Sequence, residues 1–249
     1  MPNQRLSRKM LHICIVFVII VIIVFVAMMF ILNYDVKGEK NMPFSVSKIS
    51  IISTVDGEDV ENSEYKWDIN IIQNNDVHVY IEKNSGYKKQ ETISNVKVDN
   101  FTIKNLPNIG EIKIYRPSTS DKVFFENTEE YQTNSITFIG EKTTDTKNLQ
   151  ISNQGGIIRF RCANNNVGKY LSNDDEEVKY DELLKKTNVS ESSLKATVSF
   201  DITITLNSGK VFKAENVEIK IPNEDIINEG TVGFENTDIE NIIFKRIEN

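Results

Sequence analysis

The apolar residues of this chain follow two patterns, one continuous and one alternating. From Leu11 to Leu32 every helical face is apolar, and His12, near the start of the run, is its only strongly polar side chain. A helix of this length rises about 33 Å, which is enough to cross a hydrocarbon core of about 30 Å. Because a helix of a soluble protein keeps a polar face, we predict a transmembrane helix over residues 11–32.

Beyond residue 42, apolar and polar residues alternate in short runs separated by Asn, Ser and Gly. A period of two is typical of strands, and this spacing favours a β-sandwich or jelly-roll-like region with about ten to twelve short strands. A bulge is expected near Ser47 and Lys48, where the alternation slips. The strands are predicted within residues 43–55, 65–73, 77–81, 96–103, 111–117, 135–140, 156–163, 194–206, 210–222 and 231–247.

Two tight turns and one helix complete the predicted elements. Asn74-Asn75-Asp76 and Asn207-Ser208-Gly209 each lie between alternating runs, so each is predicted to close a β-hairpin. Residues 171–187 are the one predicted helix of the β-rich region. Ser172 or Asn173 can cap this helix, acidic residues fill its first turn, and two lysines close it.

These elements divide the chain into four parts. A basic head of residues 1–10 precedes the transmembrane helix, a polar stalk of residues 33–42 follows it, and residues 43–249 form the β-rich region. A weak similarity between two hairpins leaves open a division of this region into two subdomains, about residues 43–150 and 151–249.

Charges beside the apolar run predict the orientation of the helix. Arg5, Arg8 and Lys9 precede it without any acid, whereas the flank after Asn33 mixes both signs. The positive-inside rule then places the N-terminus in the cytoplasm and the bulk of the chain outside the plasma membrane. The alternative, a cleaved signal peptide, fits less well because such peptides have an apolar region of about 7–15 residues and a small-x-small cleavage site.

The region after the helix is acidic and has a single cysteine. It holds all 36 acidic residues, whereas three of the 29 basic residues precede the helix, so its net charge is about −10. Such a surface repels phosphate backbones, and no nucleic-acid partner is expected. Cys14 lies in the apolar run, so Cys162 has no partner for a disulfide within the β-rich region. Cys162 is expected to be a small buried hydrophobe of a strand.

Residue types that carry chemistry are few or scattered. His78, the one histidine after the helix, is predicted on the solvated face of a strand, and a zinc site of His and Cys ligands is excluded by number. Tyr65 and Trp67 could form a platform for a sugar, but their alternation places them in the core. The acidic clusters lack the spacing of a calcium loop and are expected to be solvated. They are Glu58-Asp59-Glu61, Glu129-Glu130 and residues 173–177. The sequence thus predicts no catalytic, cofactor-binding or metal-binding residue and favours a protein without catalysis.

A family resemblance rests on the basic head, the apolar run and strand segments such as residues 42–55 and 77–89. In these features the chain resembles the small single-pass envelope proteins of AT-rich Gram-positive bacteria. The resemblance implies a membrane-anchored, extracytoplasmic protein and brings no catalytic residue with it. The leading hypothesis is a tethered β-domain that binds another envelope component, a protein or a glycan. Two alternatives stay open: a surface hydrolase that cleaves carbohydrate with paired carboxylates, and an accessory subunit of a membrane secretion or transport assembly.

Overall fold

One long helix, twelve strands and four short helical segments make up the described part of the chain. The structure is a computed structural model. It describes residues 3–36, 42–119, 124–141, 145, 148–175, 177–237, 239 and 241–247, with the backbone alone for residues 3–9 and 29–36.

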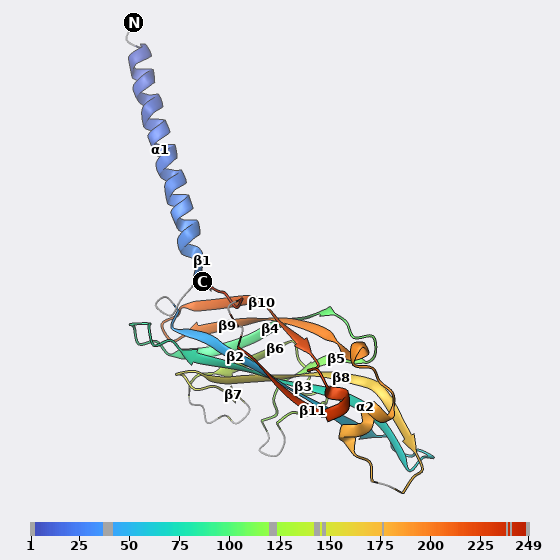
Figure 1. The fold of residues 1–249 in the computed structure, drawn as a ribbon. Helices are drawn as coiled ribbons and strands as arrows, with labels where there is room; N and C mark the ends of the chain where they lie inside the picture. The colour runs from blue at the N-terminus through green and yellow to red at the C-terminus, as the bar shows by residue number, and fades with distance from the viewer. Residues whose placement is uncertain are drawn as a thin grey trace.

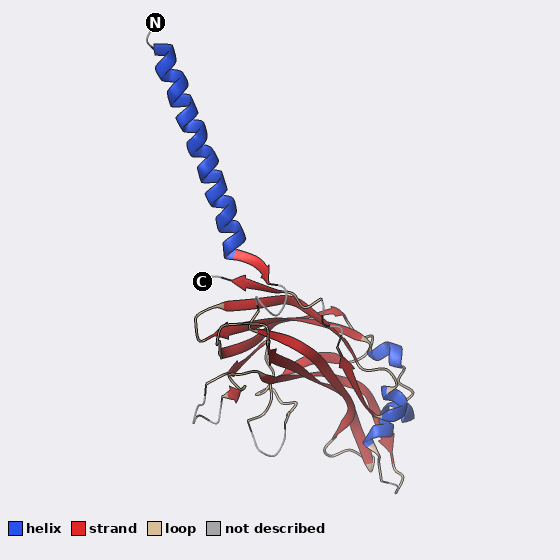
Figure 2. Cartoon of the chain, turned by 60° about the vertical axis from the view of Figure 1, so that its left-hand side comes forward, coloured by secondary structure: helices blue, strands red, loops and turns tan. Residues whose placement is uncertain are grey.

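The apolar run lies within helix α1, which spans Asn3–Leu32. Its segment Met10–Met28 has a mean hydropathy of 3.4 and is long and apolar enough to cross a membrane. The rest of the described chain buries none of this segment, and Figure 2 shows the helix standing clear of the sheets. An apolar helix is therefore present over the predicted residues, and it begins eight residues earlier than predicted.

The remainder is mainly β, as predicted, and forms two sheets (Figure 1). The seven-stranded sheet has the order β1-β12-β10-β9-β4-β6-β7, and the five-stranded sheet has the order β11-β2-β3-β8-β5. Every strand pair is antiparallel except the parallel pair of β6 and β7. The strands are β1 (Asn33–Val36), β2 (Phe44–Asp59), β3 (Trp67–Lys83), β4 (Ile93–Asn105), β5 (Glu111–Tyr115), β6 (Ser135–Ile139), β7 (Leu149–Gln150), β8 (Gly156–Ser172), β9 (Ala196–Leu206), β10 (Val211–Ile221), β11 (Thr231–Asn236) and β12 (Phe244–Ile247).

The order of strands bears on the two divisions of the chain that the sequence suggested. Both sheets combine strands from before and after residue 150, so the strands do not separate into two bodies there. Residues 33–36 of the predicted stalk form β1, which pairs with β12, and residues 37–41 lie outside the described residues.

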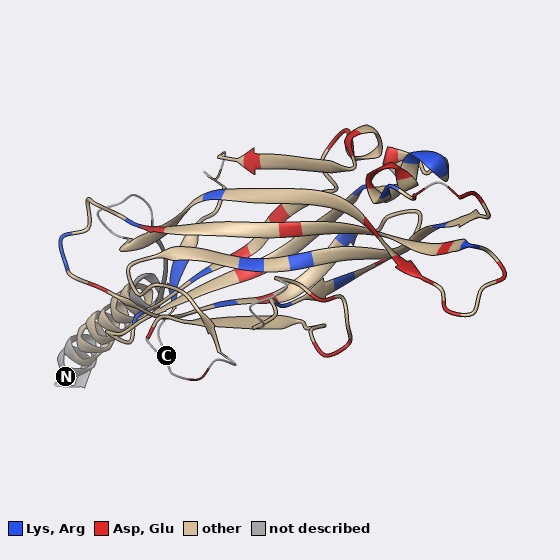
Figure 3. Ribbon diagram, turned by 90° about the horizontal axis from the view of Figure 1, so that it is seen from below, with Lys and Arg blue, Asp and Glu red and all other residues tan. Residues whose placement is uncertain are grey.

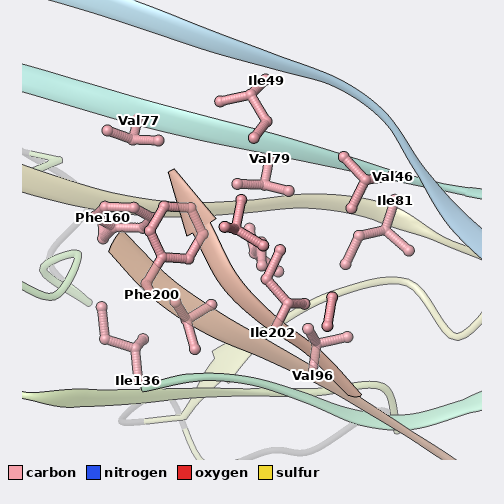
Figure 4. Packing of buried hydrophobic residues seen from close by; sticks show 14 of the residues in the cluster. Val46, Ile49, Val77, Val79, Ile81, Val96, Ile136, Phe160, Phe200 and Ile202 are labelled. Atoms are coloured by element: carbon pink, nitrogen blue, oxygen red, sulfur yellow. The ribbon is translucent and has the colours of Figure 1, made fainter. Parts of the chain in front are cut away.

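The main core fills the space between the two sheets. Phe160 of β8 and Phe200 of β9 are buried, with ring centroids 5.0 Å apart, and Phe101 of β4 packs 5.1 Å from Phe160. Figure 4 shows the rings of Phe160 and Phe200 facing each other from opposite sheets, among aliphatic side chains of both sheets. Alternation explains this arrangement, because one face of each strand supplies the apolar residues that the facing sheet covers.

A second apolar cluster lies at the far end of the sandwich, under the short helical segments. It includes Ile69, Ile71, Leu183, Leu184 and Ile226, all fully buried. The segments are η1 (Tyr180–Glu182), α2 (Leu183–Lys186), α3 (Glu191–Leu194) and α4 (Ile226–Glu229).

The predicted turn at residues 74–76 is wrong, because β3 continues through it. Asn75 is fully buried on the inner face of the five-stranded sheet, between Ser53 of β2 and Cys162 of β8. Its amide accepts a hydrogen bond from Ser53 Oγ at 2.8 Å and donates to the carbonyl oxygen of Cys162 at 3.1 Å. Gln73 exchanges two further hydrogen bonds with Asn75. Neighbouring strands therefore supply hydrogen-bond partners for the side-chain amide of Asn75, a residue that the sequence alone assigns to a turn.

The predicted helix over residues 171–187 is also mostly wrong. Leu171 and Ser172 still belong to β8, and helical backbone begins only at Tyr180. Asn173 does not cap a helix: its Oδ1 accepts a hydrogen bond from the backbone N–H of Lys66 at 3.0 Å. Burial of Leu183 and Leu184 in the second cluster holds the short helix that does form.

Other local predictions are confirmed. The register of β2 shifts between Val46 and Lys48, at the expected bulge. Asn207 to Gly209 joins β9 to β10, and Gly209 has a positive φ of 83° that an L side chain rarely adopts. The tail yields two strands, β11 and β12, but they belong to different sheets.

Candidate binding groove

An open seam runs between the two sheets where β10 and β11 face each other. β10 pairs with β12 only over residues 211–214, so residues 217–221 have a described strand neighbour, β9, on one side only. β11 is the last strand of the five-stranded sheet. A groove of about 760 Å³ lies between these two strand edges, with Ile221 and Val232 among the residues on its walls.

The free edge of β11 exposes backbone hydrogen-bonding groups. Val55 N–H donates to the carbonyl oxygen of Gly230 at 3.0 Å, so these two residues form a hydrogen-bonded pair. In an antiparallel ladder such pairs alternate along the strand. By the register of β2 and β11, the N–H and C=O groups of Thr231, Gly233 and Glu235 therefore point away from β2.

Phe234 gives the groove an apolar wall. It lies opposite Ile51, whose side chain is buried between the sheets, so Phe234 is on the inner face of its sheet. Its side chain is nevertheless 54% exposed, because the seam is open there. An exposed aromatic residue on an inner face marks a surface that another apolar group can cover.

The loop after β10 fixes the shape of the groove. The side-chain amide of Asn223 donates to the carbonyl oxygens of Ile51 and Val232, both at 2.8 Å. The backbone N–H of Asn223 donates to Ser53 Oγ at 2.9 Å, and this hydroxyl in turn donates to Asn75. A chain of buried hydrogen bonds thus links the groove to the centre of the five-stranded sheet.

Charges of both signs surround the groove. Lys195 and Lys220 lie on its walls, as do Glu224 and Asp225. Lys195 pairs with Glu191 at 3.1 Å. Mixed charge around an apolar floor is suited to a protein segment and does not select a polyanion.

His78 and Cys162, the one histidine and the one cysteine after the apolar run, lie on opposite faces of the five-stranded sheet. His78 is half-buried on the outer face of the five-stranded sheet, and burial, reinforced by the nearby charge of Arg159, lowers its pKa. Cys162 is fully buried on the inner face, as predicted, and burial raises the pKa of its thiol strongly. The thiol thus stays protonated at neutral pH and has no contact with the imidazole.

The aromatic pair is placed differently from the prediction. Tyr65 precedes β3 and is 38% exposed, so its prediction as core is wrong. Trp67 packs partly buried against the second cluster, and its indole N–H donates to the carbonyl oxygen of Asp174 at 3.2 Å. Asp175 nearby is fully exposed and pairs with Lys66 at 2.7 Å. Among the described residues, no group of three or more His, Cys, Asp and Glu could hold a metal ion.

A carboxylate pair that the sequence analysis missed lies on the outer face of the seven-stranded sheet. Asp99 of β4 and Asp201 of β9 are directly opposite each other, and Asp99 lines a hollow of about 600 Å³. Like charges in such a pair repel. Lys97 offsets the charge of Asp99 at 2.6 Å, and Lys213 offsets that of Asp201 at 2.8 Å.

Asp201 also holds two β-bulges in place. Asn100 and Asn216 have positive φ angles of 55° at the bulges of β4 and β10. Asn100 Nδ2 donates to Asp201 at 2.7 Å, and the backbone N–H of Asn216 donates to it at 2.9 Å. Burial disfavours the charged form of Asp201, but these hydrogen bonds and that of Lys213 outweigh it and lower its pKa. An ionised, clamped carboxylate is suited to a structural role and not to general acid catalysis.

Asp201→Asn is expected to lower the free energy of unfolding at pH 7 by about 2 kcal/mol, since it replaces charged hydrogen bonds. Folding lowers the pKa of Asp201, so its charged form stabilises the folded protein at pH values above the unfolded-state pKa of about 3.9. This stabilisation is lost as the pH falls through the lower pKa of the folded state. The difference between variant and parent should therefore narrow as the pH falls below about 4.

Urea unfolding of the full chain in detergent, followed by Trp67 fluorescence at several pH values, measures this difference. Glu215→Gln is the matched control, because Glu215 also contacts Lys213, at 3.3 Å, but is 51% exposed. Its effect should stay below about 0.5 kcal/mol. A loss of stability in Asp201→Asn that does not change with pH would contradict the assigned role.

The groove and the apolar helix are the features that bear on function. No family model, no curated protein and no solved structure matches the chain.

Proposed function

We propose that this chain is a membrane-tethered binding module of the cell envelope that acts without catalysis. Helix α1 crosses the plasma membrane with its N-terminus in the cytoplasm, and the two-sheet body lies outside. The asymmetric basic head and the apolar run support this topology.

The groove between β10 and β11 is the proposed site, and its partner is an extended segment of another envelope protein. The observation that carries this proposal is the pair of strand edges that flank an apolar groove. Residues 217–221 of β10 offer a backbone edge for pairing, and Phe234 offers an apolar wall for alternate side chains of the incoming strand. Strand addition of this kind takes affinity from main-chain hydrogen bonds and specificity from side-chain pockets.

The surface hydrolase is the weaker proposal. Such an enzyme needs two carboxylates in a cleft, one of them protonated. Asp99 and Asp201 are each paired with a lysine, and the pKa of Asp201 is lowered. The proposed accessory subunit of a transport assembly would bind through α1, and no described contact of that helix favours it.

A photo-crosslinking side chain at Lys220, which is exposed on the groove wall, tests the proposed site in intact cells. The expected product is a covalent adduct with one other envelope protein. Phe234→Lys should abolish the adduct because it puts a charge on the apolar wall. Phe124→Lys is the matched control: Phe124 is 68% exposed, does not line the groove, and should leave the adduct intact. An adduct that survives Phe234→Lys would place the partner elsewhere.

A further inference from the structure

The edges of the two sheets are protected to different degrees. The outer edge of β5 is covered, because Tyr115 bridges to Gln132 and Thr133 N–H donates to the carbonyl oxygen of Ile114 at 2.9 Å. β7 and β1 are short, with two and four residues. β11 has six residues, and within the described chain it pairs only with β2.

β11 also lacks the features with which proteins block an open edge. Its sequence, TVGFEN, contains no Pro and no Lys, and no bulge interrupts its pairing with β2. Two large apolar side chains are exposed at this edge, Phe234 on the inner face at 54% and Ile52 beside Gly233 at 38%. An unprotected strand of this kind is a template for another strand.

We propose that β11 pairs antiparallel with β11 of a second copy of this chain, about a two-fold axis through Gly233. The outward backbone groups belong to Thr231, Gly233 and Glu235. Centring the pair on Gly233 makes three hydrogen-bonded pairs, whereas a shift of the axis to Phe234 makes two. The first register is therefore preferred.

Side chains are complementary in this register. Val232 meets the partner's Phe234 on the inner face, and Thr231 meets the partner's Glu235 on the outer face, so no like charges meet. Glu235 is already paired with Lys48 of its own chain at 2.8 Å. Gly233 lies opposite its own copy, and a Cβ added there would meet no atom within 4 Å, so a side chain can be introduced at the centre of the pair.

The orientation of the sheet agrees with two copies in one membrane. Figure 3, which looks from below along the general direction of α1, shows the strands face-on, and β11 is the last strand of its sheet. A two-fold axis normal to the sheet therefore runs roughly along α1, and both helices leave the dimer on the same side. On the proposed topology, a shared membrane raises the effective concentration of the two edges. The dimer uses the outer edge of β11 and packs Phe234 against the second copy, whereas the strand proposed above pairs with the β10 edge and also packs on Phe234. The two proposals share this side chain but have separate tests, because the cysteines report only the contact between two copies of β11.

One cysteine introduced into β11 of the full chain, in intact cells with a mild oxidant, tests the register. The background is Cys14→Ser, which removes the cysteine of α1; Cys162 is buried. Gly233→Cys should yield about tenfold more disulfide dimer than Thr231→Cys, because the Cα atoms of a disulfide lie within about 7 Å and two copies of residue 231 would be about 14 Å apart. Co-expressed Thr231→Cys and Glu235→Cys chains should form a mixed disulfide.

Each outcome decides the proposal. Dimers from Gly233→Cys together with the mixed disulfide support it. Three results would overturn it. They are equal disulfide yields at residues 231, 233 and 235, a dimer from Phe234→Cys in place of Gly233→Cys, and no dimer at all. Adducts between the β11 cysteines and a different protein would also overturn it, while they would leave the proposed binding function standing.

Discussion

Asn75→Ala is expected to destabilise the folded chain by about 3 kcal/mol. The substitution removes the acceptor of the Ser53 hydroxyl, the donor to Gln73 Oε1 and the side-chain donor to the Cys162 carbonyl oxygen, at a position with no exposed surface. A buried polar group left without a partner costs about 1–3 kcal/mol. Two groups lose their partner, the Ser53 hydroxyl proton and Gln73 Oε1, while Ser53 Oγ keeps its bond from Asn223 N–H and Gln73 Nε2 keeps its bond to the carbonyl oxygen of Asn74. Two such losses in one buried network make this one of the largest effects expected for a single side chain.

Asn70→Ala is the matched control, because it is the same change in the same strand. Asn70 is half-buried, and its side chain makes no hydrogen bond within the described residues. Its effect should be below about 0.5 kcal/mol. Urea unfolding of the full chain in detergent, followed by Trp67 fluorescence, compares the two. Equal effects of the two substitutions would show that the network around Asn75 contributes little.

The same network explains why the sequence misleads at this point. Asn74, Asn75 and Asp76 have the composition of a turn, although they lack the glycine that takes the positive φ in the turn of Asn207 to Gly209. The decisive difference lies in residues far along the chain. Ser53 and Cys162 supply the hydrogen bonds that make an extended Asn75 stable.

Long-range packing also determines the secondary structure of residues 171–187. Their helix signals are real, with a polar start and lysines at the end. β3 extends β8 through Ser172 instead, since Trp67 pairs with Ser172 and Asp68 with Leu171. Tertiary pairing overrides local propensity here. The apolar run and the alternation of the β-rich region were predictable because each depends on a period within one segment.

The groove could not have been predicted. Its walls come from β10, β11 and the loop at Asn223, and it exists because β12 stops short of residues 217–221. The sequence shows that Phe234 lies among small and polar residues. It does not show that the facing sheet leaves this inward-pointing side chain uncovered. Asp99 and Asp201, about a hundred residues apart in the chain, meet for the same reason: strand order is not encoded in local patterns.

The second large effect concerns the sidedness of the membrane. Three basic residues precede the apolar run without an acid, and all 36 acidic residues follow it. Basic residues next to a membrane span are retained on the cytoplasmic side. We therefore expect a protease added outside the cell to reach the C-terminal end of the chain and not its N-terminal end. Moving the three basic residues to the other flank, between Asn33 and Lys40, should weaken or reverse this orientation.

Protease digestion of intact protoplasts that carry the full chain with different tags at its two ends tests the proposed topology most directly. The account predicts that the C-terminal tag is digested and that the N-terminal tag stays protected until the membrane is opened with detergent. Loss of the N-terminal tag with retention of the C-terminal one would place the β-rich body in the cytoplasm and contradict the account.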